Sequence, residues 1–257
     1  GENIYVKLNN EIRKLNNSLD FNQDLEGEIA KFYNNSNAII KKNFGLIEYD
    51  ATQLYRRSSR YLNCSRHKKI FNKFKAIPKF CFDCFKIQIS VKNVIDLIRL
   101  HVFFNQYNFK QNLTRKCMIE LRPNINDMYK GLIYCESLNQ ADSIKEELKN
   151  KINFSFEIQI KKGCTEFGNS YPEFKKLDSK YSDVGKDWDS DVEENFDKKH
   201  PNLNIFNISN VSLKGLFLQD VLVFRNWLYF AQKNDDKTYK KISYNTFKSN
   251  FIDSKLK

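Results

Sequence analysis

Five side chains that can bind a metal ion lie at three places in the sequence. Cys64-x-x-His67 and Cys81-x-x-Cys84 are two ligand pairs separated by 13 residues. A two-residue spacing lets both side chains of a pair point at one tetrahedral ion, as in structural zinc sites. Cys164 is a fifth candidate, and in place of His67 it would complete four cysteine ligands, which suit zinc or an iron–sulfur cluster equally. We predict a zinc site, with an iron–sulfur cluster as the alternative cofactor; the other interpretation is that these are ordinary thiols.

The first ligand pair lies inside a strongly basic stretch. Residues 51–82 contain nine Arg or Lys and no Asp or Glu, interleaved with Tyr and Phe. Arginine can hold a phosphate through two hydrogen bonds, and aromatic rings can stack on bases. The alternative is an amphipathic helix whose aromatic side chains are core and whose charges face solvent. We predict that this stretch binds nucleic acid or another polyanion through Arg56, Arg57, Arg60, Arg66, Lys68 and Lys69.

The charge of the whole chain is weaker evidence for such a partner. The net charge is +12, but Asn, Lys, Ile, Phe and Tyr are abundant while Gly and Pro are scarce, as an AT-rich coding sequence produces in any protein. No apolar run approaches the length of a membrane span, and the first residues have no signal-peptide pattern. Six cysteines in 257 residues are too few for a disulfide scaffold, so we expect a cytoplasmic protein with reduced thiols.

Hydrophobic periodicity switches between helix and strand along the middle of the chain. The predicted order from about residue 80 to residue 164 is βαββαβ, which is the ferredoxin-like motif with an antiparallel sheet. We therefore predict an α+β protein with helical N- and C-terminal extensions, divided into segments 1–79, 80–165 and 166–257 of one compact domain. The predicted strands are residues 85–90, 117–122, 131–136 and 154–161, and the helices between them are 91–107 and 137–152.

The predicted topology brings distant residues to one edge of the sheet. In the strand order 4-1-3-2, the start of the first strand lies beside the end of the fourth, which places Cys81 and Cys84 near Cys164. Glu120, Arg122 and Glu166 fall along the same edge. They are candidate acid, base and anion-orienting groups of an enzyme acting on a small phosphorylated or nucleotide-linked substrate. The alternative for these three residues is a structural ion pair.

Other functional motifs are absent or incomplete. The outward positions of the first strand are polar, and Tyr134 is the one aromatic residue expected on that face, so base stacking of the RNA-recognition type is not predicted. Asp187-x-Asp-x-Asp resembles the start of a calcium loop, but Val192 and Lys198 occupy positions that need Gly and Glu. No Walker loop, dinucleotide fingerprint, zinc-protease motif or nucleophile elbow occurs.

A segment near the C-terminus is apolar on most sides of a helix. Residues 213–230 are therefore predicted to be buried, where they could cover the otherwise open face of the sheet. If this helix is exposed instead, it is the predicted partner surface of a non-catalytic interaction subunit. His101 falls on the apolar stripe of its own helix and is predicted to be a core residue. Cys117 and Cys135 lie on the same faces of their strands as aliphatic residues, so their side chains should also point into the core.

Overall fold

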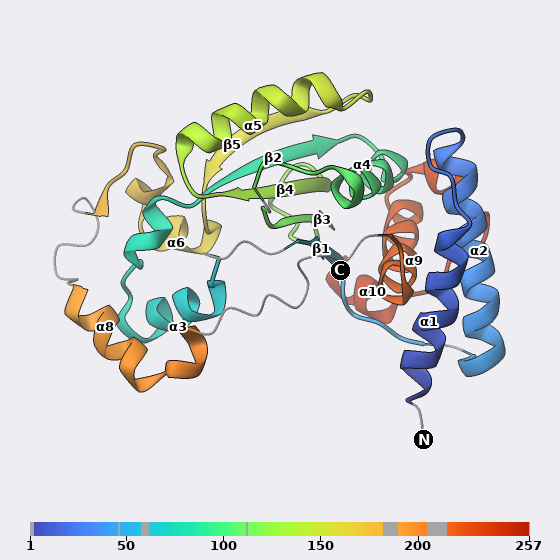
Figure 1. Ribbon diagram of the computed structural model, residues 1–257, viewed down its shortest axis with the longest axis horizontal. Helices are drawn as coiled ribbons and strands as arrows, with labels where there is room; N and C mark the ends of the chain where they lie inside the picture. The colour runs from blue at the N-terminus through green and yellow to red at the C-terminus, as the bar shows by residue number, and fades with distance from the viewer. Residues whose placement is uncertain are drawn as a thin grey trace.

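The computed structural model describes residues 3–45, 47–57, 62–111, 113–181, 190–204 and 215–256, which form a mixed α+β fold (Figure 1). None of the helices in these ranges is both long and apolar enough to cross a lipid bilayer. The strands are β1 (Gln53–Arg56), β2 (Phe85–Val91), β3 (Arg115–Ile119), β4 (Tyr129–Cys135) and β5 (Glu157–Lys162). The α-helices are α1 (Ile4–Asn17), α2 (Leu25–Phe44), α3 (Cys64–Phe74), α4 (Val94–Gln106), α5 (Leu138–Lys151), α6 (Thr165–Ser170), α8 (Ser190–Lys199), α9 (Leu218–Lys233) and α10 (Asn250–Lys255). Short 3-10 helices are η1 (Lys79–Phe82), η2 (Pro172–Lys175), η3 (Pro201–Asn204) and η4 (Lys237–Lys241).

The described strands form one five-stranded sheet in the order β1-β3-β4-β2-β5, with every neighbouring pair antiparallel. Strands β2 to β5 correspond to the four predicted strands. β1 is a fifth, which we did not predict, and it lies in the segment 1–79 that we expected to be helical. It pairs with β3, so that Tyr55 lies opposite Lys116. The N-terminal segment therefore adds an edge strand to the sheet as well as helices.

One face of the sheet is covered by α4, α5 and α9. The side chains that point toward these helices are mostly apolar, and Cys117 and Cys135 lie among them, 0% and 2% exposed, as predicted. Helix α4 approaches β4 most closely at Gly131, where an added Cβ would lie 2.4 Å from Leu100 Cδ2. The alternation along each strand thus separates a packed helical face from an opposite, polar face.

Helix α9 lies at the centre of the helical layer, with α1 and α2 on its far side from the sheet (Figure 1). Nearly every side chain from Leu218 to Ala231 is buried, as the apolar pattern predicts. The helix does not cover the open face, because it packs on β1 beside α4. The helix is also not an exposed partner surface. Residues 213 and 214 of the predicted helix lie outside the described residues. The condition set for an interaction surface on this helix, its exposure, is therefore not met.

A buried ionic network joins β1, α4 and α9. Arg56 Nη2 donates to Asp220 Oδ1 at 2.6 Å, and His101 Nε2 lies 2.7 Å from the same oxygen. All three residues are at most 3% exposed. Arg56 Nε also donates to Asn105 Oδ1 at 3.0 Å. Each buried charge thus has a partner, as burial of an ion requires, and His101 is the core residue that the sequence predicted.

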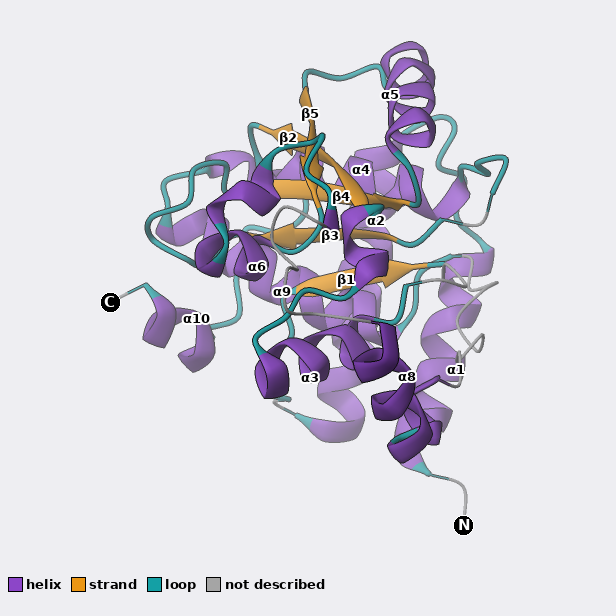
Figure 2. Ribbon diagram, turned by 90° about the vertical axis from the view of Figure 1, so that its left-hand side faces the viewer, coloured by secondary structure: helices purple, strands orange, loops and turns teal. Residues whose placement is uncertain are grey.

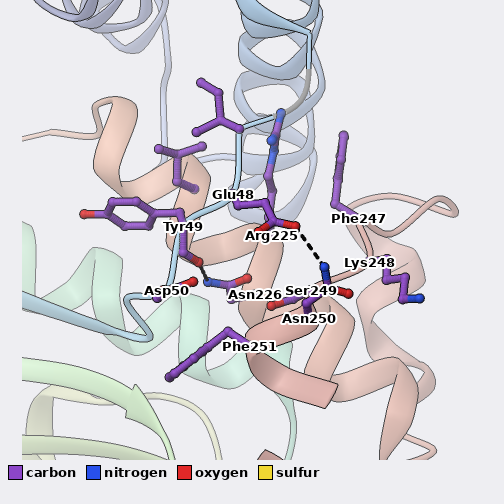
Figure 3. A pocket seen from close by; sticks show the side chains of 12 residues that line it. Glu48, Tyr49, Asp50, Arg225, Asn226, Phe247, Lys248, Ser249, Asn250 and Phe251 are labelled. Carbon is purple, nitrogen blue, oxygen red and sulfur yellow. Dashed lines mark hydrogen bonds between the residues drawn. The ribbon is translucent and has the colours of Figure 1, made fainter. Parts of the chain in front are cut away.

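Hydrogen bonds from α9 and α10 also hold the segment that leads into β1 (Figure 3). Asn226 Nδ2 donates to the carbonyl of Tyr49 at 2.6 Å, and Asn250 Nδ2 donates to Glu48 Oε1 at 3.0 Å. The cavity between these residues holds about 20 Å³, which is room for about one water molecule. These hydrogen bonds therefore fix the position of β1 at the edge of the sheet.

Candidate metal centre and open sheet face

The face of the sheet opposite α4, α5 and α9 carries polar and aromatic side chains. They line two adjoining hollows of about 440 and 410 Å³, which share Lys86, Met118 and Leu132 among their lining residues. We call the joined hollows the trough. Its first hollow is lined by Tyr55, Cys64, Lys68, Lys86, Lys116, Tyr134 and Cys164, among others, and its second by Gln88, Lys130 and Lys161.

Helices α3, α6 and α8 gather on the side of the sheet away from α1 and α2 (Figure 1). Figure 2 looks onto this side and shows the three helices in front of the strands. Asn63 caps α3 by accepting a hydrogen bond from the Arg66 N–H, which places Cys64 in the first turn of the helix. Cys164 is the residue immediately before α6. Two helix starts therefore bring a cysteine each to the trough.

The 3-10 helix η1 contributes Cys81, and the turn between η1 and β2 contributes Cys84. Gly163 N–H donates to the carbonyl of Cys84 at 2.9 Å, and a Cβ added to Gly163 would lie 3.5 Å from Cys84 Sγ. Cys164 packs against the apolar cluster that contains Cys81. The prediction that Cys81 and Cys84 lie near Cys164 is confirmed. Among the described residues, no three His, Cys, Asp or Glu side chains are already set for metal coordination.

The four thiols influence one another electrostatically. Burial first, and the neighbouring thiols of Cys64 and Cys164 second, raise the pKa of Cys84 to about 12. The pKa of Cys81 lies well above its ordinary value for the same two reasons, burial first and the neighbouring thiols second. The thiols are therefore protonated at neutral pH unless a cation compensates the charge of the thiolates. A divalent metal supplies that compensation, because it displaces the thiol protons when it binds.

Three lysines surround the thiols of Cys64 and Cys164. Lys86 Nζ donates to Thr165 Oγ1 at 3.2 Å, and Lys116 Nζ donates to Gln53 Oε1 and to the Tyr55 hydroxyl, each at 3.3 Å. Lys68 lies 3.9 Å from the exposed carboxylate of Glu166. Within the described ranges, neither Lys86 nor Lys116 has a carboxylate at salt-bridge distance.

The lysines therefore carry charge that the described carboxylates do not balance. Burial, together with the charges of Lys86 and Lys68, lowers the pKa of Lys116 to about 8. The pKa of Lys86 is lowered as well, chiefly by burial. Cationic side chains held close together in a hollow favour an anion beside them, because each then gains an opposite charge.

His67 is not grouped with the four cysteines. Its Nδ1 lies 3.1 Å from Arg66 Nη1, and its ring stacks on Phe80 with centroids 5.2 Å apart. Burial and the charge of Arg66 lower the pKa of His67 to about 4, so the imidazole is neutral at physiological pH. Its other ring nitrogen is buried, and none of the described residues forms a hydrogen bond with it. Of the five predicted ligands, the structure gathers the cysteines and turns His67 toward α8.

The predicted basic surface is largely neutralised from within the chain. Arg56 and Arg57 are 3% and 6% exposed, so they are not part of an exposed phosphate-binding surface, and that part of the prediction is wrong. Arg66 is held by Glu193 and Asp197 at 3.0 and 2.7 Å. Arg60 lies outside the described residues, as do Asp187 and Asp189 of the rejected calcium loop. Lys68 and Lys69 remain exposed on α3.

The three enzyme candidates form ion pairs. Arg122 Nε donates to Glu120 Oε1 at 2.5 Å, and Lys130 Nζ lies 3.5 Å from the other carboxylate oxygen. Burial raises the pKa of Glu120, but the hydrogen bond from Arg122 and the charge of Lys130 outweigh it and hold the pKa below its ordinary value. Glu120 is thus ionised and paired, and Glu166 is exposed beside Lys68. This arrangement matches the structural alternative for these residues.

The sequence reasoning missed Tyr55 and Lys116 as residues of the site. Both depend on β1, whose only signal is the short alternation Gln53-Leu54-Tyr55-Arg56. Comparisons of the chain with protein-family models, with curated proteins and with solved structures found no match. The class of function is therefore argued from the trough and its cysteines alone.

Proposed function

We propose that this protein is a metal-stabilised module that binds nucleic acid through its phosphates, with the trough as its contact surface. The observation that carries the proposal is the convergence of two cysteines and three lysines on one hollow of the uncovered sheet face, with Cys81 and Cys84 buried beside Cys164. The strand order supports a further point, that β2 to β5 with α4 and α5 form a ferredoxin-like unit to which β1 is added.

The proposed metal is zinc, bound by Cys64, Cys81, Cys84 and Cys164, and an iron–sulfur cluster is the alternative for the same ligands. Zinc bound by four thiolates carries about two negative charges. Lys68, Lys86 and Lys116 lie around the ligands of the hollow, and their three positive charges exceed those two negative charges. The ion would join α3, the turn after η1 and the start of α6, three segments that are distant in the sequence. Reduced thiols are needed for this site, so we propose a cytoplasmic location.

The trough supplies more positive charge than the metal site needs. Lys161 lies on the trough face of β5 and donates to Gln88 Oε1 at 3.0 Å, and Lys69 is exposed on α3 beside Lys68. Phosphate groups bound along this line would release counterions, so affinity should fall steeply as salt increases. The neutralised arginines are not needed, because the phosphate contacts are assigned to lysines of the open face.

The experiment measures metal and nucleic-acid binding on the same preparations. Protein purified anaerobically should contain about one zinc per chain by mass spectrometry. The Cys81→Ser/Cys84→Ser variant should lose it, whereas Cys135→Ser, which changes a core thiol on β4, should keep it. Iron with visible absorbance in place of zinc would identify a cluster. Wild-type protein without metal would contradict the metal site.

Binding of a fluorescent single-stranded oligonucleotide is then titrated by anisotropy at several salt concentrations. Lys86→Gln/Lys116→Gln should weaken binding and reduce the slope of log affinity against log salt by about 1.4, at about 0.7 per lost phosphate contact. The matched control is Lys31→Gln/Lys248→Gln, which changes the net charge equally at exposed positions on α2 and near α10. Equal losses in both variants, or no binding at low salt, would refute the assignment of the contact to the trough.

A further inference from the structure

Two tyrosines face the trough with one ammonium group between them. Tyr55 comes from β1 and Tyr134 from β4, and Lys116 Nζ lies 5.2 Å from the first ring centroid and 5.9 Å from the second. The Tyr55 side chain is 51% exposed, and the Tyr134 side chain is partly exposed in the same hollow. Met118 and Leu132 supply apolar surface beside them. The trough therefore offers aromatic rings as well as positive charge.

The unexpected strand removes one objection to base stacking on this sheet. The sequence placed a single aromatic residue on the open face, Tyr134, which is too few for a stacking surface. β1 adds Tyr55 to the same face, because its neighbours Leu54 and Arg56 are buried on the helical side. Two rings on strands β1 and β4 can each support one base.

We infer that the trough binds single-stranded nucleic acid, with bases stacked on Tyr55 and Tyr134 and the phosphates held by Lys68, Lys86 and Lys116. This inference rests on the proposed function and names the class of nucleic acid. Stacking of a base on an exposed aromatic ring is tolerant of sequence, since every base has a flat π-face. Lysine contacts to phosphate are equally independent of sequence. The site therefore binds single strands with little base preference.

The shape of the trough excludes a duplex from these rings. In a duplex the bases are already stacked on one another, so their faces cannot reach a tyrosine on the floor of a hollow. The trough is lined by residues of α3 and α6, among them Lys68 and Glu166, and by residues of the turn from Arg122 to Asp127. A strand with unstacked bases enters such a groove, whereas the outer surface of a duplex meets its rim.

The test compares three probes on the full chain: a labelled single-stranded 12-mer, the corresponding duplex and labelled inorganic polyphosphate. Tyr55→Leu and Tyr134→Leu should each weaken binding of the single strand about 5- to 150-fold, the range for loss of one stacked base. Binding of polyphosphate should not change, because it has no bases. Tyr244→Leu is the control, since Tyr244 is 80% exposed outside the trough. Tyr55→Phe keeps the ring and should retain affinity for the single strand.

Three outcomes separate this inference from the function on which it rests. Unchanged single-strand binding in Tyr55→Leu overturns the stacking assignment while lysine-dependent binding stands. Tighter binding of the duplex than of the single strand by wild-type protein overturns it as well. Absence of binding to all three probes at low salt overturns the proposed function itself. Tyr55 is an exposed side chain, so its variant tests the inference even if Tyr134→Leu perturbs the sheet.

Discussion

Replacing Arg56 by Met should destabilise the protein and leave the trough intact. The substitution removes the guanidinium that donates to Asp220 Oδ1 at 2.6 Å. The carboxylate of Asp220, which is 0% exposed, then stays in the interior without this cation. His101 and the Phe217 N–H, at 2.7 and 2.9 Å, are its remaining partners. An arginine that the sequence suggests for phosphate binding is thus expected to act on stability instead.

The size of the effect follows from the burial of the pair. Removing one partner of a buried ion pair costs about 3 to 5 kcal/mol, because the other charge remains in the interior. For a domain of this size, that corresponds to a fall in melting temperature of roughly 6 to 20 °C. Removing both charges avoids most of the penalty, so Arg56→Met/Asp220→Leu should be more stable than Arg56→Met.

The loss of stability in Arg56→Met should also depend on pH in a defined direction. Burial first, and then the charge of Arg56, lower the pKa of His101, so removal of Arg56 lets that pKa rise. In the wild type the lowered pKa of His101 costs stability as pH falls below the unfolded-state pKa, and this cost is smaller when Arg56 is absent. The deficit of Arg56→Met should therefore be smaller at about pH 6 than at about pH 8.

Urea denaturation followed by circular dichroism measures these free energies, and oligonucleotide anisotropy checks the trough. Lys86→Gln is the matched comparison, because it removes a charge from the open face and should lower affinity with little effect on stability. Wild-type stability of Arg56→Met together with weakened nucleic-acid binding would refute the reasoning. It would mean that Arg56 faces a ligand and that the buried network is not formed.

Two further predictions follow from the geometry. Lys116 has a pKa of about 8 without a ligand, and a bound anion favours its charged form. The affinity for the single strand should therefore be highest below about pH 8 and should fall as the pH rises above that value. In Lys116→Arg the affinity measured by anisotropy should change little with pH across that range, because Arg stays charged. A pH-independent affinity of the wild-type protein would contradict the assignment. Gly131→Ala should cost about 1 to 3 kcal/mol in urea denaturation, because the new Cβ would lie 2.4 Å from Leu100 Cδ2. An unchanged midpoint would show that α4 can move away from β4.

The regular elements were predictable from the sequence because their burial patterns are local. The alternation in β2 and β4 and the apolar pattern of α9 each identify an element within one short window. β1 was not predictable in this way, because it has four residues, and its last residue, Arg56, is followed by a second arginine. Its identity as a strand depends on pairing with β3, about sixty residues later.

The site was predictable where topology alone determines position. Cys84 and Cys164 lie together because antiparallel neighbours join the start of β2 to the end of β5. The charge of the basic segment was not predictable, because its acidic partners are remote. Arg56 meets Asp220, 164 residues away, and Arg66 meets Glu193 and Asp197. A run of like charge therefore shows which residues need partners and not whether those partners are ligands or distant parts of the same chain.

The central position of α9 has a consequence for folding during translation. Leu218 N–H donates to Asn9 Oδ1, a contact that spans 209 residues, and α1 and α2 pack against this helix. At about 5 to 20 residues per second, the ribosome needs roughly 10 to 40 s to make the intervening chain. During that interval the apolar sides of α1 and α2 lack their native partner. The nascent chain therefore exposes them to chaperones until α9 emerges from the ribosome, and the core closes only after that point.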